Sequence, residues 1–167
     1  MNINGYTLKA VKHFMGNEGY GFSANLYYNN KKIGEVTDTA NGSCEIDIYL
    51  DMKHEAEHGK NLDTDFIERL YRLGDQEKSF KDMMKKTPDK ALICVTFSKP
   101  TKNGDYYLEY HGSKGMTEEI FTEWHEKINS GGQIEKIEIF TSLDDFNIQD
   151  AGLSEDLLQQ QNGMTMS

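Results

Sequence analysis

Residues 20–31 read Tyr20-Gly21-Phe22-Ser23-Ala24-Asn25-Leu26-Tyr27-Tyr28-Asn29-Asn30-Lys31. Every second residue from Tyr20 to Tyr28 is apolar or aromatic, which predicts a β-strand with one buried face. Asn29 and Asn30 then supply a two-residue turn, because asparagine tolerates the positive φ of a type I′ hairpin. Residues 31–38 are therefore expected to return as the partner strand.

The strand pattern continues beyond this hairpin. A turn at Asn41-Gly42 precedes a stretch from Cys44 to Leu50 in which apolar and polar residues alternate. Such alternation predicts an antiparallel strand with one face in water. The first fifty residues are thus expected to form an antiparallel meander.

The middle of the chain changes to a helical period. An apolar stripe in residues 63–73 predicts a helix, and Gly74 is expected to end or break it. A second helix is expected over residues 76–86, because Lys85 and Lys86 suit the C-terminal end of the helix dipole and Pro88 follows.

The last part returns to strand, helix and strand. Residues 91–97 are apolar without interruption, which predicts a strand buried on both faces, and residues 106–110 alternate as the next strand. Thr117 is a good N-cap for a helix that reaches about residue 129. Its inward side chains are expected to be Ile120, Phe121, Trp124 and Ile128. A final strand is expected over residues 134–140.

These elements predict an α+β fold, with a mainly antiparallel sheet of six to seven strands and two to four helices packed on it. The length favours one domain over residues 1–150, followed by a polar tail at residues 151–167 that could hold a short helix. Cys44 and Cys94 lie in strand-like runs and are expected to be buried, unpaired thiols. No signal peptide and no apolar run of about 20 residues is visible, so a cytoplasmic location is expected.

Acidic charge is concentrated in the last two-fifths of the chain. Residues 1–50 carry 4 basic and 5 acidic side chains, residues 51–100 carry 10 and 10, and residues 101–167 carry 4 and 13. The last segment thus holds nearly all of the net charge of −10. Such a field repels nucleic acid and membrane surfaces and attracts basic partners. Direct binding of nucleic acid or membrane is therefore not expected.

One short motif matches a catalytic pattern. His54-Glu55-Ala56-Glu57-His58 fits the H-E-x-x-H pattern of zinc peptidases, in which the histidines share a metal ion and the glutamate polarises its bound water. Gly59 leaves room for barely two helical turns, and Thr64 occupies the position of the third metzincin ligand. We therefore expect a solvated helix or loop with no metal and no cofactor, and keep a metal site at His54 and His58 as the alternative.

Other catalytic patterns are weaker. Asp47, Asp51 and Lys53 loosely match the acidic pair and lysine with which nucleases hold a divalent metal ion. A basic groove for a nucleic-acid backbone is missing, and no serine lies in a Gly-x-Ser-x-Gly turn.

Eight acidic residues are candidate partner-binding residues. They are Glu118, Glu119, Glu123, Glu126, Glu135, Glu138, Asp144 and Asp145. Like charges at helical spacing, as in Glu119 and Glu123, repel by roughly 0.2–0.5 kcal/mol per pair. Two interpretations stay open: a solvated acidic surface, or a patch that imitates a nucleic-acid backbone and caps a basic groove on a protein partner.

Residues 22–36, with Asn41-Gly42 after them, resemble the opening hairpin of small uncharacterised proteins carried by phages, plasmids and other bacterial mobile elements. The shared pattern is F-x-A-x-L-Y-x-N-G-K-K-x-G; here Asn29-Asn30 replaces Asn-Gly, and Gly42-Ser43 replaces Gly-Gly. The resemblance covers about a quarter of the chain, brings no catalytic residues and implies a mobile-element origin. Small acidic proteins of that origin are often inhibitors of bacterial defence nucleases.

Charge and resemblance together predict an acidic protein-binding module rather than an enzyme. The expected function is inhibition of a bacterial nucleic-acid-handling protein, by a phage or mobile-element protein that caps a basic surface. The alternatives are a small metal-dependent hydrolase that uses His54, Glu55 and His58, and an inert accessory subunit.

Overall fold

The structure is a computed structural model, and it describes residues 1–149. It confirms the predicted α+β class, with three α-helices and nine strands among the described residues. The chain divides into two compact units, one formed by residues 1–74 with the segment from Asn147 and the other by residues 75–146. The single domain expected over residues 1–150 stays a prediction.

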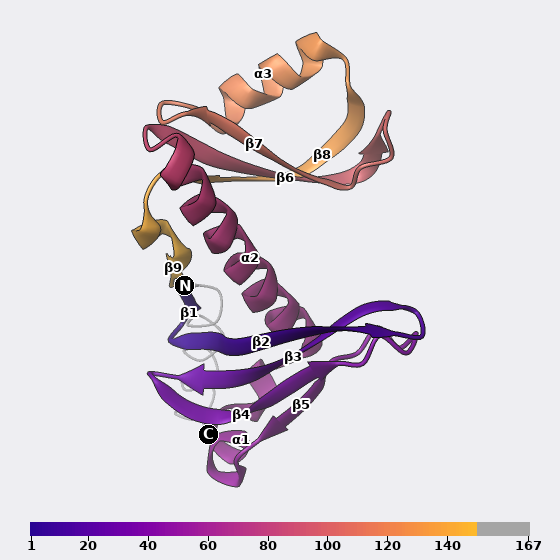
Figure 1. Cartoon of the computed structure of the whole chain (residues 1–167), viewed down its shortest axis with the longest axis vertical. Helices are drawn as coiled ribbons and strands as arrows, with labels where there is room; N and C mark the ends of the chain where they lie inside the picture. The colour runs from indigo at the N-terminus through magenta and orange to yellow at the C-terminus, as the bar shows by residue number, and fades with distance from the viewer. Residues whose placement is uncertain (150–167) are drawn as a thin grey trace, which may run out of the picture. The chain divides into compact units, whose positions relative to one another are not determined.

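The first unit is built on a six-stranded sheet in the order β5-β4-β3-β2-β1-β9 (Figure 1). All neighbours are antiparallel except β1 and β9, which run parallel. The strands are β1 (Asn2–Ile3), β2 (Tyr6–Gly16), β3 (Gly19–Tyr28), β4 (Lys31–Asp38), β5 (Asp47–Leu50) and β9 (Asn147–Ile148).

The central hairpin forms as its sequence predicts. Asn29 and Asn30 connect β3 to β4 with φ of 46° and 67°, which is the backbone conformation of a type I′ turn. The turn sets the register so that Ala24 and Leu26 share a buried face with Val36.

The strand expected from Cys44 is shorter than predicted. It begins only at Asp47, and Cys44 is exposed rather than buried. The backbone leaves the sheet before this point, because the Ile46 N–H donates to Thr64 Oγ1 at 3.0 Å instead of to a neighbouring strand. Ile46 is nevertheless buried, so the apolar residue is placed without the strand.

Three helical segments follow β5. They are α1 (Met52–His58), the 3-10 turn η1 (Gly59–Asn61) and α2 (Thr64–Lys86). The predicted break at Gly74 is wrong, because α2 runs through it without interruption. A glycine inside a helix costs only about 1 kcal/mol relative to alanine, and buried neighbours such as Leu70 and Leu73 outweigh that cost.

The second unit is a three-stranded antiparallel sheet with α3 over one face (Figure 1) and the C-terminal part of α2, from residue 75, on the other. Its order is β7-β6-β8, with β6 (Lys90–Thr101), β7 (Tyr107–Ser113), β8 (Gly131–Phe140), α3 (Glu118–Ile128) and η2 (Leu143–Phe146). On one face Ile93, Val95 and Phe97 pack with Phe121 of α3. On the other face Gln76 of α2 donates to the Tyr107 hydroxyl at 3.3 Å. The strand predicted to be buried on both faces is therefore confirmed as β6.

Two further expectations concern the polar tail and the absence of a membrane-spanning helix. The short helix expected in the polar tail at residues 151–167 lies outside the described residues. No helix within residues 1–149 combines the length and apolar character needed to cross a bilayer.

Candidate functional site

The helix α3 begins where the sequence predicts. Thr117 has extended backbone angles, and its Oγ1 accepts a hydrogen bond from the Ile120 N–H at 3.2 Å. At the other end Asn129 takes the left-handed conformation, with φ 51° and ψ 40°, that commonly stops a helix. These two residues fix the length of α3 at 11 residues.

The buried face of α3 differs from the prediction. Phe121 and His125 are buried, whereas Trp124 is 41% exposed, so the expected inward position of Trp124 is wrong. Ile120 and Ile128 are likewise 50% and 45% exposed, against the prediction. The helix is rotated because His125 takes the inner position.

A hydrogen bond allows this histidine to be buried. His125 Nε2 lies 2.9 Å from Ser130 Oγ, and the imidazole packs on the Phe97 ring with centroids 5.5 Å apart. A buried polar group that finds a partner costs little, so histidine can replace an apolar residue here. The sequence pattern alone assigned that position to Trp124.

The rotation leaves an apolar ridge on α3, formed by Ile120, Trp124 and Ile128. Residues four apart lie on one side of a helix, so the three side chains form a continuous row. The Trp124 indole packs edge-on against Tyr110 of β7, with ring centroids 5.6 Å apart. The apolar ridge therefore lies on the β7 side of the helix.

Four glutamates accompany this apolar ridge on α3. Glu118, Glu119, Glu123 and Glu126 are all exposed, and Lys127 is the lysine among them. At 100° per residue, Lys127 lies next to the apolar ridge, Glu123, Glu119 and Glu126 follow on the outward face, and Glu118 lies on the far side of the helix. The structure thus brings Glu119, Glu123 and Glu126 together on the outward face, with Lys127 between them and the apolar ridge.

The other predicted acidic residues do not all join them. Glu135 is exposed on β8, but Glu138 is only partly exposed and lies near Gln76, whose Nε2 donates to its Oε1 at 3.4 Å. Glu138 also pairs with Lys136 at 3.6 Å. It therefore points to the sheet face opposite α3, with a structural role rather than a place in the acidic surface.

The two aspartates lie in η2. Asp144 is exposed, while the Asp145 carboxylate accepts hydrogen bonds from the N–H groups of Thr141 at 2.7 Å and Ser142 at 3.1 Å. Partial burial raises the pKa of Asp145, but these hydrogen bonds outweigh it and hold the pKa below its ordinary value. Asp145 is thus a capping residue of η2.

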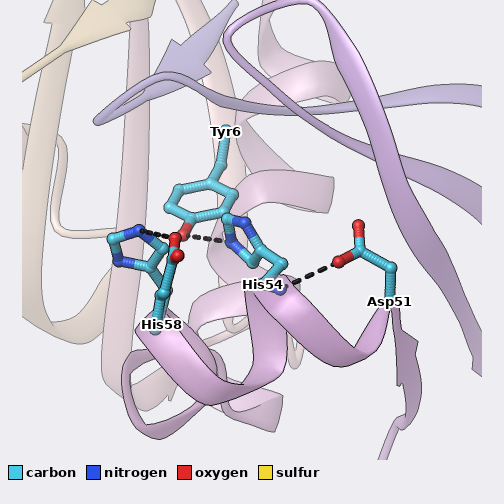
Figure 2. A network of polar contacts seen from close by, with 5 residues as sticks. Tyr6, Asp51, His54 and His58 are labelled. Carbon is cyan, nitrogen blue, oxygen red and sulfur yellow. Dashed lines mark hydrogen bonds and ion pairs between the residues drawn. The ribbon is translucent and has the colours of Figure 1, made fainter.

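The histidine motif lies in α1, a helix of seven residues (Figure 2). Asp51 caps it by accepting from the His54 N–H at 2.8 Å. The His54 ring is buried, with Nε2 2.8 Å from the Tyr6 hydroxyl of β2. The His58 ring lies beside it, with centroids 4.8 Å apart, and pairs with Glu57 at 3.8 Å.

The surroundings of these histidines are typical of a packed aromatic cluster and not of a metal site. Burial lowers the pKa of His54, with a further contribution from His58, and burial raises the pKa of Tyr6 to about 12. Glu55, the expected base, instead lines a hollow of about 570 Å³ with residues that include Tyr49, Leu50 and Lys60. Within residues 1–149 no three histidine, cysteine or carboxylate side chains are placed to hold a metal ion.

The second cysteine is also unsuited to catalysis. Burial raises the pKa of the Cys94 thiol to about 12, so the reactive thiolate is disfavoured at neutral pH. Family models, curated proteins and solved structures were compared with this chain, and none matches. Among the described residues, the outward surface of α3 is the best-defined candidate site.

Proposed function

We propose that this chain is an acidic protein-binding module that caps a basic surface of a partner through the outward side of α3. The single observation that carries the proposal is the apolar ridge at Trp124, exposed beside Glu119, Glu123 and Glu126. Exposed tryptophan is typical of binding hot spots, and surrounding charge of one sign selects partners of the opposite sign.

The alternative, a solvated acidic surface, accounts for the glutamates but not for the apolar ridge. An isolated exposed apolar side chain needs no explanation, whereas a row at i, i+4 and i+8 on one helix is typical of an interaction surface. We further propose, from the hairpin resemblance and the charge, that the partner is a bacterial nucleic-acid-handling protein and that binding inhibits it.

The hydrolase alternative lacks a comparable observation. His54 Nε2 is already 2.8 Å from a tyrosine hydroxyl, and Glu55 lies in different surroundings. A catalytic zinc site needs three protein ligands and an open position. These contacts favour a packed histidine cluster over a catalytic site.

The test is capture of a partner from bacterial lysate by the immobilised chain. The test variant reverses Glu119, Glu123 and Glu126 to lysine, and a control variant makes the same change of charge at exposed Glu18, Glu45 and Glu68. We expect wild type and control to retain the same nucleic-acid-binding protein and the test variant to lose it, because exposed charges contribute little to folding but much to recognition.

Two further measurements test the electrostatic nature of the complex: its response to added salt and its competition with nucleic acid. The complex should dissociate as salt is added, since the Debye length falls to about 8 Å at 0.15 M, and duplex DNA should compete with the chain for the partner. Equal capture by the test variant, with no response to salt, would leave the acidic surface as a solvated one and defeat the proposal.

A further inference from the structure

The outer edge of β7 is open for pairing. The sheet order places β7 at one side, and within residues 1–149 its only strand neighbour is β6. An edge strand offers a row of backbone donors and acceptors to another chain. The edge runs beneath the side of α3 that carries Trp124, because Trp124 packs on Tyr110 of the same strand.

The hydrogen-bond phase identifies which groups point outward. The Phe97 N–H donates to the Tyr106 carbonyl at 2.8 Å, so Phe97 and Tyr106 form a hydrogen-bonded pair, in which the backbone groups of Tyr106 point toward β6. Inward and outward residues alternate along an antiparallel strand, so Leu108 and Tyr110 bond to β6. The backbone groups of Glu109 and His111 consequently face the outer edge.

This edge lacks the usual protection against pairing. The opposite edge of the same sheet, β8, has register shifts beside Phe97 and carries Lys136, and such irregularities and lysines discourage strand addition. The pairing of β7 with β6 is regular over all seven residues, and β7 contains neither lysine nor proline. Regular unprotected edges are the ones that accept an extra strand.

The two faces of the edge have different character. Tyr110 and Trp124 lie on the α3 face, whereas the exposed Glu109 lies on the opposite face, where its carboxylate accepts from Ser79 Oγ at 3.3 Å. The side chains of a strand added here would point alternately toward the apolar surface of Tyr110 and Trp124 and toward the Glu109 carboxylate. The chemistry of a fitting strand follows from this alternation.

We propose that β7 accepts an extended segment of the protein partner as an additional strand, in which lysine or arginine opposite Glu109 alternates with apolar residues beneath Trp124. The inference rests on the proposed function and specifies how the basic partner is recognised. Backbone pairing supplies the affinity, while Glu109 and the apolar ridge select the alternating sequence.

A peptide of eight residues that alternates lysine and valine is the probe. Lysines opposite Glu109 would turn their own N–H groups toward β7, whereas the valine N–H groups would point away. N-methylation of the lysines should therefore weaken binding by roughly tenfold or more, and N-methylation of the valines should change it by less than about threefold. Anisotropy of a labelled peptide measures the affinity.

Location is measured by amide chemical shifts of the whole chain. We expect the largest changes at Glu109 and His111, and weaker binding to the Glu109→Gln and Trp124→Ala variants. Equal binding of the two N-methylated peptides, or unmoved shifts at these two amides, would overturn strand addition.

The two proposals fail in different experiments. If the N-methylated peptides bind equally while reversal of Glu119, Glu123 and Glu126 still abolishes partner capture, strand addition is wrong and the acidic binding module stands. If that reversal has no effect but the peptide still requires its lysine N–H groups, β7 pairs with peptides and the proposed basic-surface function is wrong.

Discussion

The Trp124 indole meets the Tyr110 ring edge-on, with centroids 5.6 Å apart and planes inclined at 81°. This contact and a second one to the Phe121 ring, with centroids 5.4 Å apart, support the indole, while 41% of the residue stays exposed, so Trp124 is held in place without being part of the core. Trp124 is also the only tryptophan of the chain, and its fluorescence therefore reports directly on the α3 surface. Binding of a partner should shift its emission to shorter wavelength.

Truncation of Trp124 should separate binding from stability. Because 41% of the residue is exposed, Trp124→Ala should lower the free energy of unfolding by only about 1–2 kcal/mol, while partner binding is lost. Phe121→Ala is the matched control, since Phe121 is 1% exposed and core phenylalanine truncations cost about 3–5 kcal/mol. Urea denaturation followed by circular dichroism measures both, and equal losses would place Trp124 in the core.

The His54 cluster should make the first unit sensitive to acid. Burial lowers the pKa of His54 in the folded chain below its ordinary value of about 6.5, so the unfolded chain binds this proton more readily. The contribution of His54 to stability is therefore complete above about pH 6.5 and declines as the pH falls toward the folded-state pKa. Urea midpoints measured from pH 7.5 to pH 5 should show this decline.

His54→Gln is the control for that prediction, because an amide still offers Tyr6 a hydrogen-bond partner but does not titrate. The variant should show a flatter pH profile over the same range. An unchanged slope would assign the acid sensitivity to other groups.

Gly74→Ala should stabilise the chain. Gly74 lies inside α2, where alanine is favoured over glycine by about 0.5–1 kcal/mol. The nearest atom to an added Cβ would be the flexible end of Met1, at 3.3 Å, which can move aside. A raised midpoint of thermal unfolding is expected, and a lowered one would show that Met1 cannot adjust.

The histidine pair should not retain zinc at stoichiometric level. The dialysed protein is expected to hold far less than one equivalent by atomic absorption, because residues 1–149 provide no third ligand near His54 and His58. His58→Ala should leave that content unchanged. A tightly held equivalent that disappears in this variant would instead support the hydrolase alternative.

Much of the fold could be predicted because local rules and tertiary packing agree. Asn29 and Asn30 take the positive φ of the predicted turn, and Thr117 caps the predicted helix. In each case the signal depends on a few neighbouring residues, and nothing elsewhere in the chain opposes it.

The errors arise where a distant contact decides. Ile46 leaves the predicted strand for a hydrogen bond to Thr64, and Gly74 remains helical because its neighbours are buried. The α3 surface was predicted only by its glutamates. Its apolar ridge was not predicted, because His125 is buried through contacts with Ser130 and Phe97. Both residues lie outside the helix, so the helical periodicity of α3 could not reveal these contacts.

Because the two thiols have different surroundings, their rates of alkylation should differ. An alkylating reagent at neutral pH should modify the exposed Cys44 at once, whereas Cys94 lies inside β6 with its pKa raised to about 12. Cys94 can react only while the strand is transiently open, so the rate of the second alkylation measures that opening. Mass spectrometry that counts one or two adducts would show whether a bound peptide slows the opening of the sheet at whose edge it pairs.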